Sequence, residues 1–78
     1  MDIEEQRNNL WNKMNDTWTE VQEQLNVLVE EEKITQDRFK EYQQRYENIR
    51  LQVKDAATEE ELNLAREKFE NLLQEIQA

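Results

Sequence analysis

The side chains of this chain that could take part in catalysis are hydroxyls, phenols, amines and carboxylates, because the sequence contains no His, Cys or Ser. The candidate nucleophiles are the tyrosines, the lysines and four threonines, namely Thr17, Thr19, Thr35 and Thr58. Such a nucleophile needs a general base beside it and donors for the developing oxyanion. The sequence shows neither device at a recognisable spacing. It therefore predicts a protein that is not an enzyme.

Carboxylates are abundant, with 19 Asp and Glu residues, and raise the question of metal binding. Two-metal sites inside helical bundles combine inward-facing Glu residues with a His three positions further on, and this chain has no His. Glu30, Glu31 and Glu32 form an acidic run without the loop and ligand number of an EF-hand. Phosphate-binding loops need Gly, which is also missing. The sequence predicts no metal, no cofactor and no small-molecule substrate.

The net charge of −9 bears on the partners of the chain. It repels the phosphates of nucleic acids and of anionic lipids, so neither nucleic acid nor a membrane surface is an expected partner. The simplest interpretation of the negative charge is that it keeps the protein soluble. Two alternatives are that it forms an acidic face for a basic partner or that the protein mimics nucleic acid. No apolar run reaches the ~20 residues of a membrane span, and the acidic start, residues 1–5, does not resemble a signal peptide. We expect a soluble, cytoplasmic protein.

Apolar residues recur at alternating spacings of three and four, which is the heptad pattern of packed helices. The period of 3.5 residues predicts left-handed, coiled-coil-like packing. The aromatic residues lie on these seams, so we expect them in the core and not in a cofactor cage. The three seams are Trp11, Met14, Trp18, Val21, Leu25 and Leu28; Phe39, Tyr42, Tyr46, Ile49, Val53 and Ala56; and Leu62, Ala65, Phe69, Leu72 and Ile76.

The helix boundaries have to be read from capping residues, because the chain has no Gly or Pro. Thr35 suits an N-cap, and Thr58 with Glu61 forms a capping box. The predicted helices cover residues 3–32, 36–56 and 59–77. Short connections make them an all-α, antiparallel, up-down-up three-helix bundle, with residues 1–78 as a single domain. An uninterrupted helix through residues 55–60 is the alternative.

The lengths and charges of the helices predict how they align. Folding the second helix back onto the first brings Ala56 level with about residue 12 and leaves roughly the first nine residues overhanging. Residues 1–32 have a net charge of −7, residues 33–57 of +2 and residues 58–78 of −4. A basic middle helix between two acidic ones favours this order, although exposed ion pairs each contribute only tenths of a kcal/mol.

Several residues are candidates for binding another protein or a second copy of the chain. Leu51 and Leu64 lie off the seams at the same predicted level, with Thr17 at a similar height, and form a candidate apolar patch; Val27 is also off the seams. The amide-rich stretch 8–19 offers a second surface, because its Leu10, Trp11 and Met14 have neutral flanks. The alternative interpretation of that stretch is a core seam.

Two resemblances accompany these patterns. Leu25 and Leu28, followed by the Ile34-Thr35 pair and Phe39, resemble the helical hairpin of the bacterial short C-terminal domain family (SHOCT), with residues 25–46 covered. That family usually has Gly before the Ile-Thr pair, where this chain has Glu32 and Lys33. The unbroken heptads and the missing Cys and His resemble designed or simplified three-helix bundles. The leading hypothesis is a non-catalytic scaffold or a de novo designed protein without native activity. The alternative is a small bacterial or phage interaction module.

Overall fold

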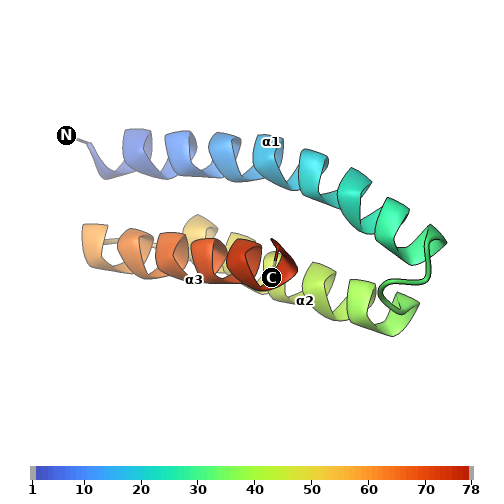
Figure 1. Cartoon of the computed structure of the whole chain (residues 1–78). Coiled ribbons are helices and arrows are strands. Elements are labelled where there is room, and N and C mark those ends of the chain that lie inside the picture. The colour runs from blue at the N-terminus through green and yellow to red at the C-terminus, as the bar shows by residue number, and fades with distance from the viewer. Residues whose placement is uncertain (1, 78) are drawn as a thin grey trace.

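The computed structural model describes residues 2–77. In this part of the chain there are three helices, α1 (Ile3–Glu30), α2 (Gln36–Asp55) and α3 (Glu59–Gln77), and no strands. Figure 1 shows α2 running back along α1 and α3 reversing again to lie beside them. The predicted all-α, antiparallel three-helix bundle is therefore confirmed. Within residues 2–77 no helix combines the length and the apolar character needed to cross a bilayer.

Side-chain caps begin α2 and α3 where the sequence predicts them. The Oγ1 atom of Thr35 accepts a hydrogen bond of 3.1 Å from the Arg38 amide, at the start of α2. At the start of α3 the Thr58 hydroxyl accepts one of 3.2 Å from the Glu61 amide. The backbone leaves the helix at Ala56, with ψ near 126°, so the alternative of one continuous rod is wrong. A cap of this kind typically contributes about 1 kcal/mol.

The end of α1 differs from the prediction by two residues, because the chain turns at Glu32. This residue has φ of 60°, in the left-handed region, and its amide donates to the Val29 carbonyl (3.0 Å). The Lys33 amide donates to the Leu28 carbonyl (2.9 Å). Together these two bonds form a Schellman motif, which normally has Gly at the left-handed position. The helix therefore ends at Glu30 without a glycine, at the expense of local strain.

Replacing Glu32 by Gly should stabilise the protein. The left-handed conformation strains any residue with a Cβ, whereas Gly adopts it freely, so we expect a gain of about 0.5–1 kcal/mol in the free energy of unfolding. Urea titration followed by circular dichroism measures this. The matched control is Glu31→Gly, which removes the same charge at a residue with φ of −82°. Equal stability changes in the two variants would contradict the strain at Glu32.

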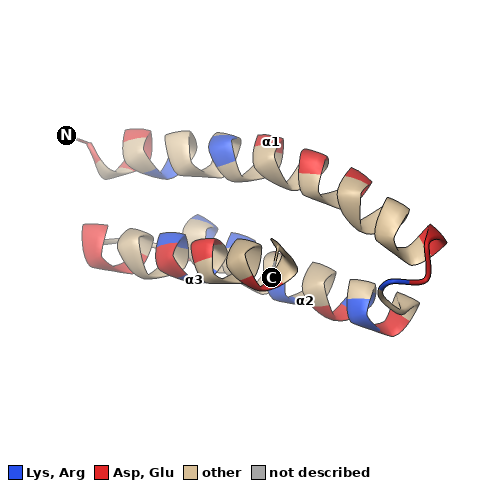
Figure 2. Cartoon of the chain, viewed as in Figure 1, with Lys and Arg blue, Asp and Glu red and all other residues tan. Residues whose placement is uncertain are grey.

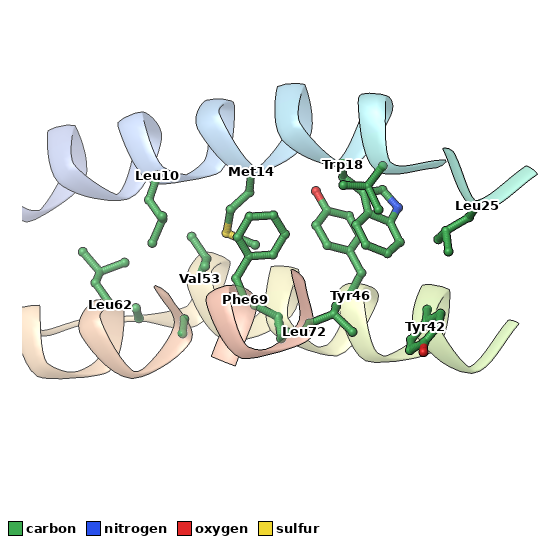
Figure 3. Close-up of a cluster of buried hydrophobic side chains, with 14 residues drawn as sticks. Leu10, Met14, Trp18, Leu25, Tyr42, Tyr46, Val53, Leu62, Phe69 and Leu72 are labelled. Carbon is green, nitrogen blue, oxygen red and sulfur yellow. The ribbon is translucent and has the colours of Figure 1, made fainter. Parts of the chain in front are cut away.

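Aromatic rings from all three helices meet in the core (Figure 3). The Trp18 and Tyr46 rings stack with their centroids 4.3 Å apart and their planes at 6°. Phe69 packs against Tyr46 at 5.8 Å in a tilted arrangement. Contacts of this kind contribute about 0.5–1.5 kcal/mol beyond the area that they bury. Within residues 2–77 the buried hydrophobic residues are Leu10, Met14, Trp18, Val21, Leu25, Tyr42, Tyr46, Ile49, Val53, Ala56, Leu62, Ala65, Phe69 and Leu72.

Most of the predicted seam positions are buried, but Trp11, Leu28, Phe39 and Ile76 are only partly buried against the core. Near the start of α1, Leu10 takes the central place predicted for Trp11 and points toward α3 in Figure 3. A strict heptad seam describes contact with one neighbour, whereas a helix in a three-helix bundle faces two and needs a wider apolar stripe.

The predicted overhang of the first nine residues is wrong. The Gln6 side-chain amide donates to Glu59 Oε1 (3.0 Å), and Arg7 Nε donates to the Ala56 carbonyl (3.1 Å). The start of α1 is therefore covered by the connection between α2 and α3. The reason is the early turn at Glu32, which slides α2 toward the start of α1. Figure 1 shows that α3 instead stops short of the opposite end, where α1 and α2 are connected.

Candidate interaction surfaces

A hollow lies beside the last described turn of α3, and we call it the end groove. Its volume is about 600 Å³, and it lies between the last turns of α1 and α3. Val27 is 49% exposed there, whereas Leu28, Ile34 and Ile76 pack partly against the core. The groove therefore has an apolar floor within the described residues. It is lined by Gln24, Val27, Leu28, Lys33, Ile34, Ile76 and Gln77.

The charged residue that lines the end groove itself is Lys33, whereas the rim beyond the lining residues on the α1 side is acidic. Residues three and four apart are neighbours on a helix surface, so Glu23, Glu30 and Glu31 surround Val27. The last turn of α1 contains no basic residue, and the negative end of the helix dipole adds to the carboxylates. Lys33 offsets this in part, because its Nζ lies 3.0 Å from Glu31 Oε2. Figure 2 shows acidic residues along the outer face of α1 and at the turn.

Leu51 and Leu64 come together as the sequence analysis predicts. Each is 55% exposed, and both line one groove of about 290 Å³ between α2 and α3, which we call the leucine groove. Asp55 and Glu61 lie on the side of the connection between the two helices, and Lys68 lies on the other side. Thr17 is half-buried on α1 and is not among the lining residues, so the structure does not place it in this patch.

The amide-rich stretch of α1 is divided between core and surface. Leu10 and Met14 are only 5% and 1% exposed, so their assignment to a binding surface is corrected: they are core residues. Trp11 remains half-buried and lines a pocket of about 360 Å³, the Trp11 pocket. Its other lining residues are Arg7, Asn8, Arg50 and Lys54. Periodicity does not reveal this cluster, because its cations come from two helices that are distant in the sequence.

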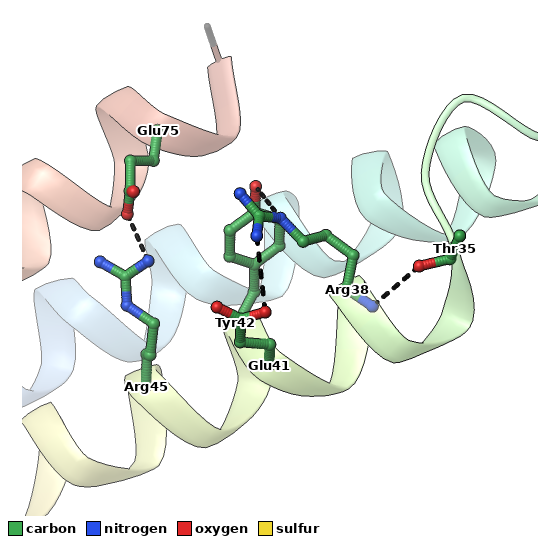
Figure 4. A network of polar contacts seen from close by, with 6 residues as sticks. All are labelled: Thr35, Arg38, Glu41, Tyr42, Arg45 and Glu75. Carbon is green, nitrogen blue, oxygen red and sulfur yellow. Dashed lines mark hydrogen bonds and ion pairs between the residues drawn. The ribbon is translucent and has the colours of Figure 1, made fainter.

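Polar contacts of α2 involve Tyr42 and a neighbouring residue of α3 (Figure 4). Arg38 Nε donates to the Tyr42 hydroxyl at 3.2 Å, and the guanidinium lies over the Tyr42 ring at 5.1 Å. The hydrogen bond with Tyr42 raises the pKa of Arg38. Arg45 forms an ion pair with Glu75 of α3, so the basic middle helix meets an acidic neighbour as predicted. These contacts are structural, and none presents a nucleophile beside a base.

The Tyr46 phenol is buried and donates a hydrogen bond of 2.8 Å to Asn15 Oδ1 on α1. Burial is the main reason that the pKa of Tyr46 rises from its usual 10 to about 12, because the phenolate would lose its hydration. The carboxylate of Glu47 adds to this rise and Arg50 opposes it. Tyr46 therefore stays protonated at neutral pH and serves as a hydrogen-bond donor between two helices.

The stability of the protein should fall between about pH 10 and pH 12 because of Tyr46. In this window the unfolded chain releases the phenol proton and the folded chain keeps it, so the unfolded state binds fewer protons and ionisation favours unfolding. We expect the free energy of unfolding to fall by about 2 kcal/mol by pH 12, and we expect no effect of the Tyr46 phenol below pH 9. Urea titrations across this range should show that Tyr46→Phe lacks the loss. Tyr42→Phe, the control, should retain it; a loss in Tyr46→Phe as large as in the parent protein would exclude Tyr46 as its source.

No group of three or more Asp and Glu side chains within residues 2–77 is placed to hold a metal ion. Comparisons of the chain with family models, with curated proteins and with solved structures found no match.

Proposed function

We propose that the chain is a non-catalytic helical scaffold that works as a protein-interaction module and binds a basic amphipathic helix in its end groove. The observation that carries this proposal is an apolar floor beside the acidic last turns of α1, which extend past Gln77, the last described residue of α3. A partner helix would continue the line of α3. Its apolar side chains would cover Val27, Leu28 and Ile34.

The chemistry of the rim selects the partner. Helices that dock into grooves present apolar anchors three and four residues apart. Lys or Arg residues beside these anchors would meet Glu23, Glu30 and Glu31, whereas acidic residues there would be repelled. Because the carboxylates are exposed, they contribute more to association rate and specificity than to affinity. The burial of Val27 and its neighbours supplies most of the binding free energy.

Two synthetic helices test this assignment, one with Leu on one face and Lys on the other, and one with Glu in place of Lys. The Lys helix should bind, with an affinity that falls as salt is added, and the Glu helix should not. Val27→Lys should weaken binding roughly tenfold, because burying a Val side chain contributes about 1.5 kcal/mol. Fluorescence anisotropy of the labelled helices measures both effects.

The matched control is Leu51→Lys, which makes the same charge change at a leucine of similar exposure on another groove. It should leave binding of the Lys helix unchanged, and circular dichroism should show the same helicity in both variants. Equal binding of the two helices, or equal weakening by both substitutions, would refute the end groove as the site.

The leucine groove favours a second candidate function, the formation of a homodimer. Leu51 and Leu64 lie between an acidic side with Asp55 and Glu61 and a basic side with Lys68. A two-fold axis that passes through the leucines and runs across the helices would place the acidic side of one copy against the basic side of the other. Such a surface is self-complementary, as symmetric dimers require.

Under this second candidate, Leu51→Glu and Leu64→Lys should each convert a dimer to a monomer and leave helicity intact, because each places a charge where two leucines would meet. We expect the dissociation constant to rise at least about tenfold, since two leucines per substitution lose burial. Size exclusion with light scattering at two concentrations measures the mass. Val27→Lys, the reciprocal control, should leave it unchanged. A monomeric parent protein at both concentrations would exclude the dimer.

A further inference from the structure

The Trp11 pocket collects positive charge on a chain whose net charge is −9. Arg7 of α1 and Arg50 and Lys54 of α2 all line it, together with the side-chain amide of Asn8. The guanidinium carbon of Arg50 lies 4.7 Å from the centre of the Trp11 ring, in a cation–π contact. The pocket therefore combines several hydrogen-bond donors with two flat surfaces, the indole and the guanidinium plane.

The neighbouring groups neutralise this charge only in part. Arg7 donates to the Ala56 carbonyl, at the negative end of the α2 dipole. Arg50 Nη1 lies 3.4 Å from Glu47 Oε1, in an exposed ion pair of the weak kind. Lys54, in the last turn of α2, takes part in none of the ion pairs found within residues 2–77. Three cations thus line the pocket, and none of its lining residues is acidic.

We propose that the Trp11 pocket binds a small planar oxyanion, an aromatic carboxylate or an aromatic phosphate ester. The ring of the ligand packs beside the Trp11 indole and the Arg50 guanidinium that covers it, and its oxygen atoms accept hydrogen bonds from Arg50, Lys54 and Asn8. Arginine is suited to both halves of this task, because its planar group stacks on rings and its fork matches an oxyanion. The pocket volume of about 360 Å³ lies in the range of small-molecule sites.

This inference is independent of the proposed function, because the end groove lies at the opposite end of α1 from Arg7. Experiments can therefore refute the anion-binding inference and the proposed function independently. A basic helix tests the acidic end, and a small anion tests the Trp11 pocket.

Benzoate and phenyl phosphate are the probes, and the side-chain N–H signals of the two tryptophans in a ¹H–¹⁵N NMR spectrum are the readout. Trp11 lines the pocket and Trp18 is buried against Tyr46, so only the Trp11 signal should shift as either probe is added. Inorganic phosphate should bind more weakly, because it lacks the ring. Benzyl alcohol and benzylamine, which lack the negative charge, should leave the signal unchanged.

Arg50→Gln and Lys54→Gln should each weaken benzoate binding by about threefold or more, as expected for one partly exposed charge. Lys40→Gln is the matched control, because it removes a cation from α2 outside the pocket and should have no effect. Circular dichroism confirms the fold of each variant. Equal responses to benzoate and benzyl alcohol, equal effects of Lys40→Gln and Lys54→Gln, or no response of Trp11 to any probe would overturn the proposal.

Discussion

The contact on which the arrangement of the helices depends is the stack of Trp18 on Tyr46, with Phe69 closing it from the third helix. Each ring buries about 150–250 Å², which at about 25 cal/mol per Å² is several kcal/mol of hydrophobic free energy for each side chain. Stacked rings tolerate little sliding. Because the Tyr46 hydroxyl also donates to Asn15, a shift of α2 by one turn would break a hydrogen bond as well as the stack. The cluster therefore determines which residues of α1 and α2 face each other.

The end groove follows from this register together with the helix lengths. With α1 and α2 aligned by the aromatic rings, α3 begins beside the first turn of α1, where Glu59 meets Gln6. Its 19 residues span about 28 Å, whereas the 28 residues of α1 span about 42 Å. The last turns of α1 thus extend past Gln77. Leu28 and Ile34 lie in this uncovered part. Their incomplete burial is therefore a consequence of how the helices align, although both side chains are hydrophobic.

Much of this structure could be predicted from the sequence, because heptad spacing and capping are local signals. The interruption at Thr58 is predictable from a hydroxyl and a carboxylate three residues apart, even without Gly or Pro. Two features are not local. The left-handed turn at Glu32 has no signature when Gly is absent, and the exchange of Leu10 for Trp11 depends on where α3 packs. The cations of the Trp11 pocket are 43 residues apart in sequence at Arg7 and Arg50, so only the register brings them together.

The charge of the whole chain is a poor guide to the individual surfaces. At physiological ionic strength exposed charges are screened beyond about 8 Å, whereas the molecule is 44 Å long. The carboxylates around Val27 therefore scarcely influence an anion beside Arg50. For the same reason, the net charge of −9 opposes anion binding at Arg50 only weakly. A ligand responds to the charges within one Debye length. By this criterion the acidic end of the protein is compatible with the proposed docking of a basic helix, and the basic pocket near the start of α1 with the proposed binding of a small anion.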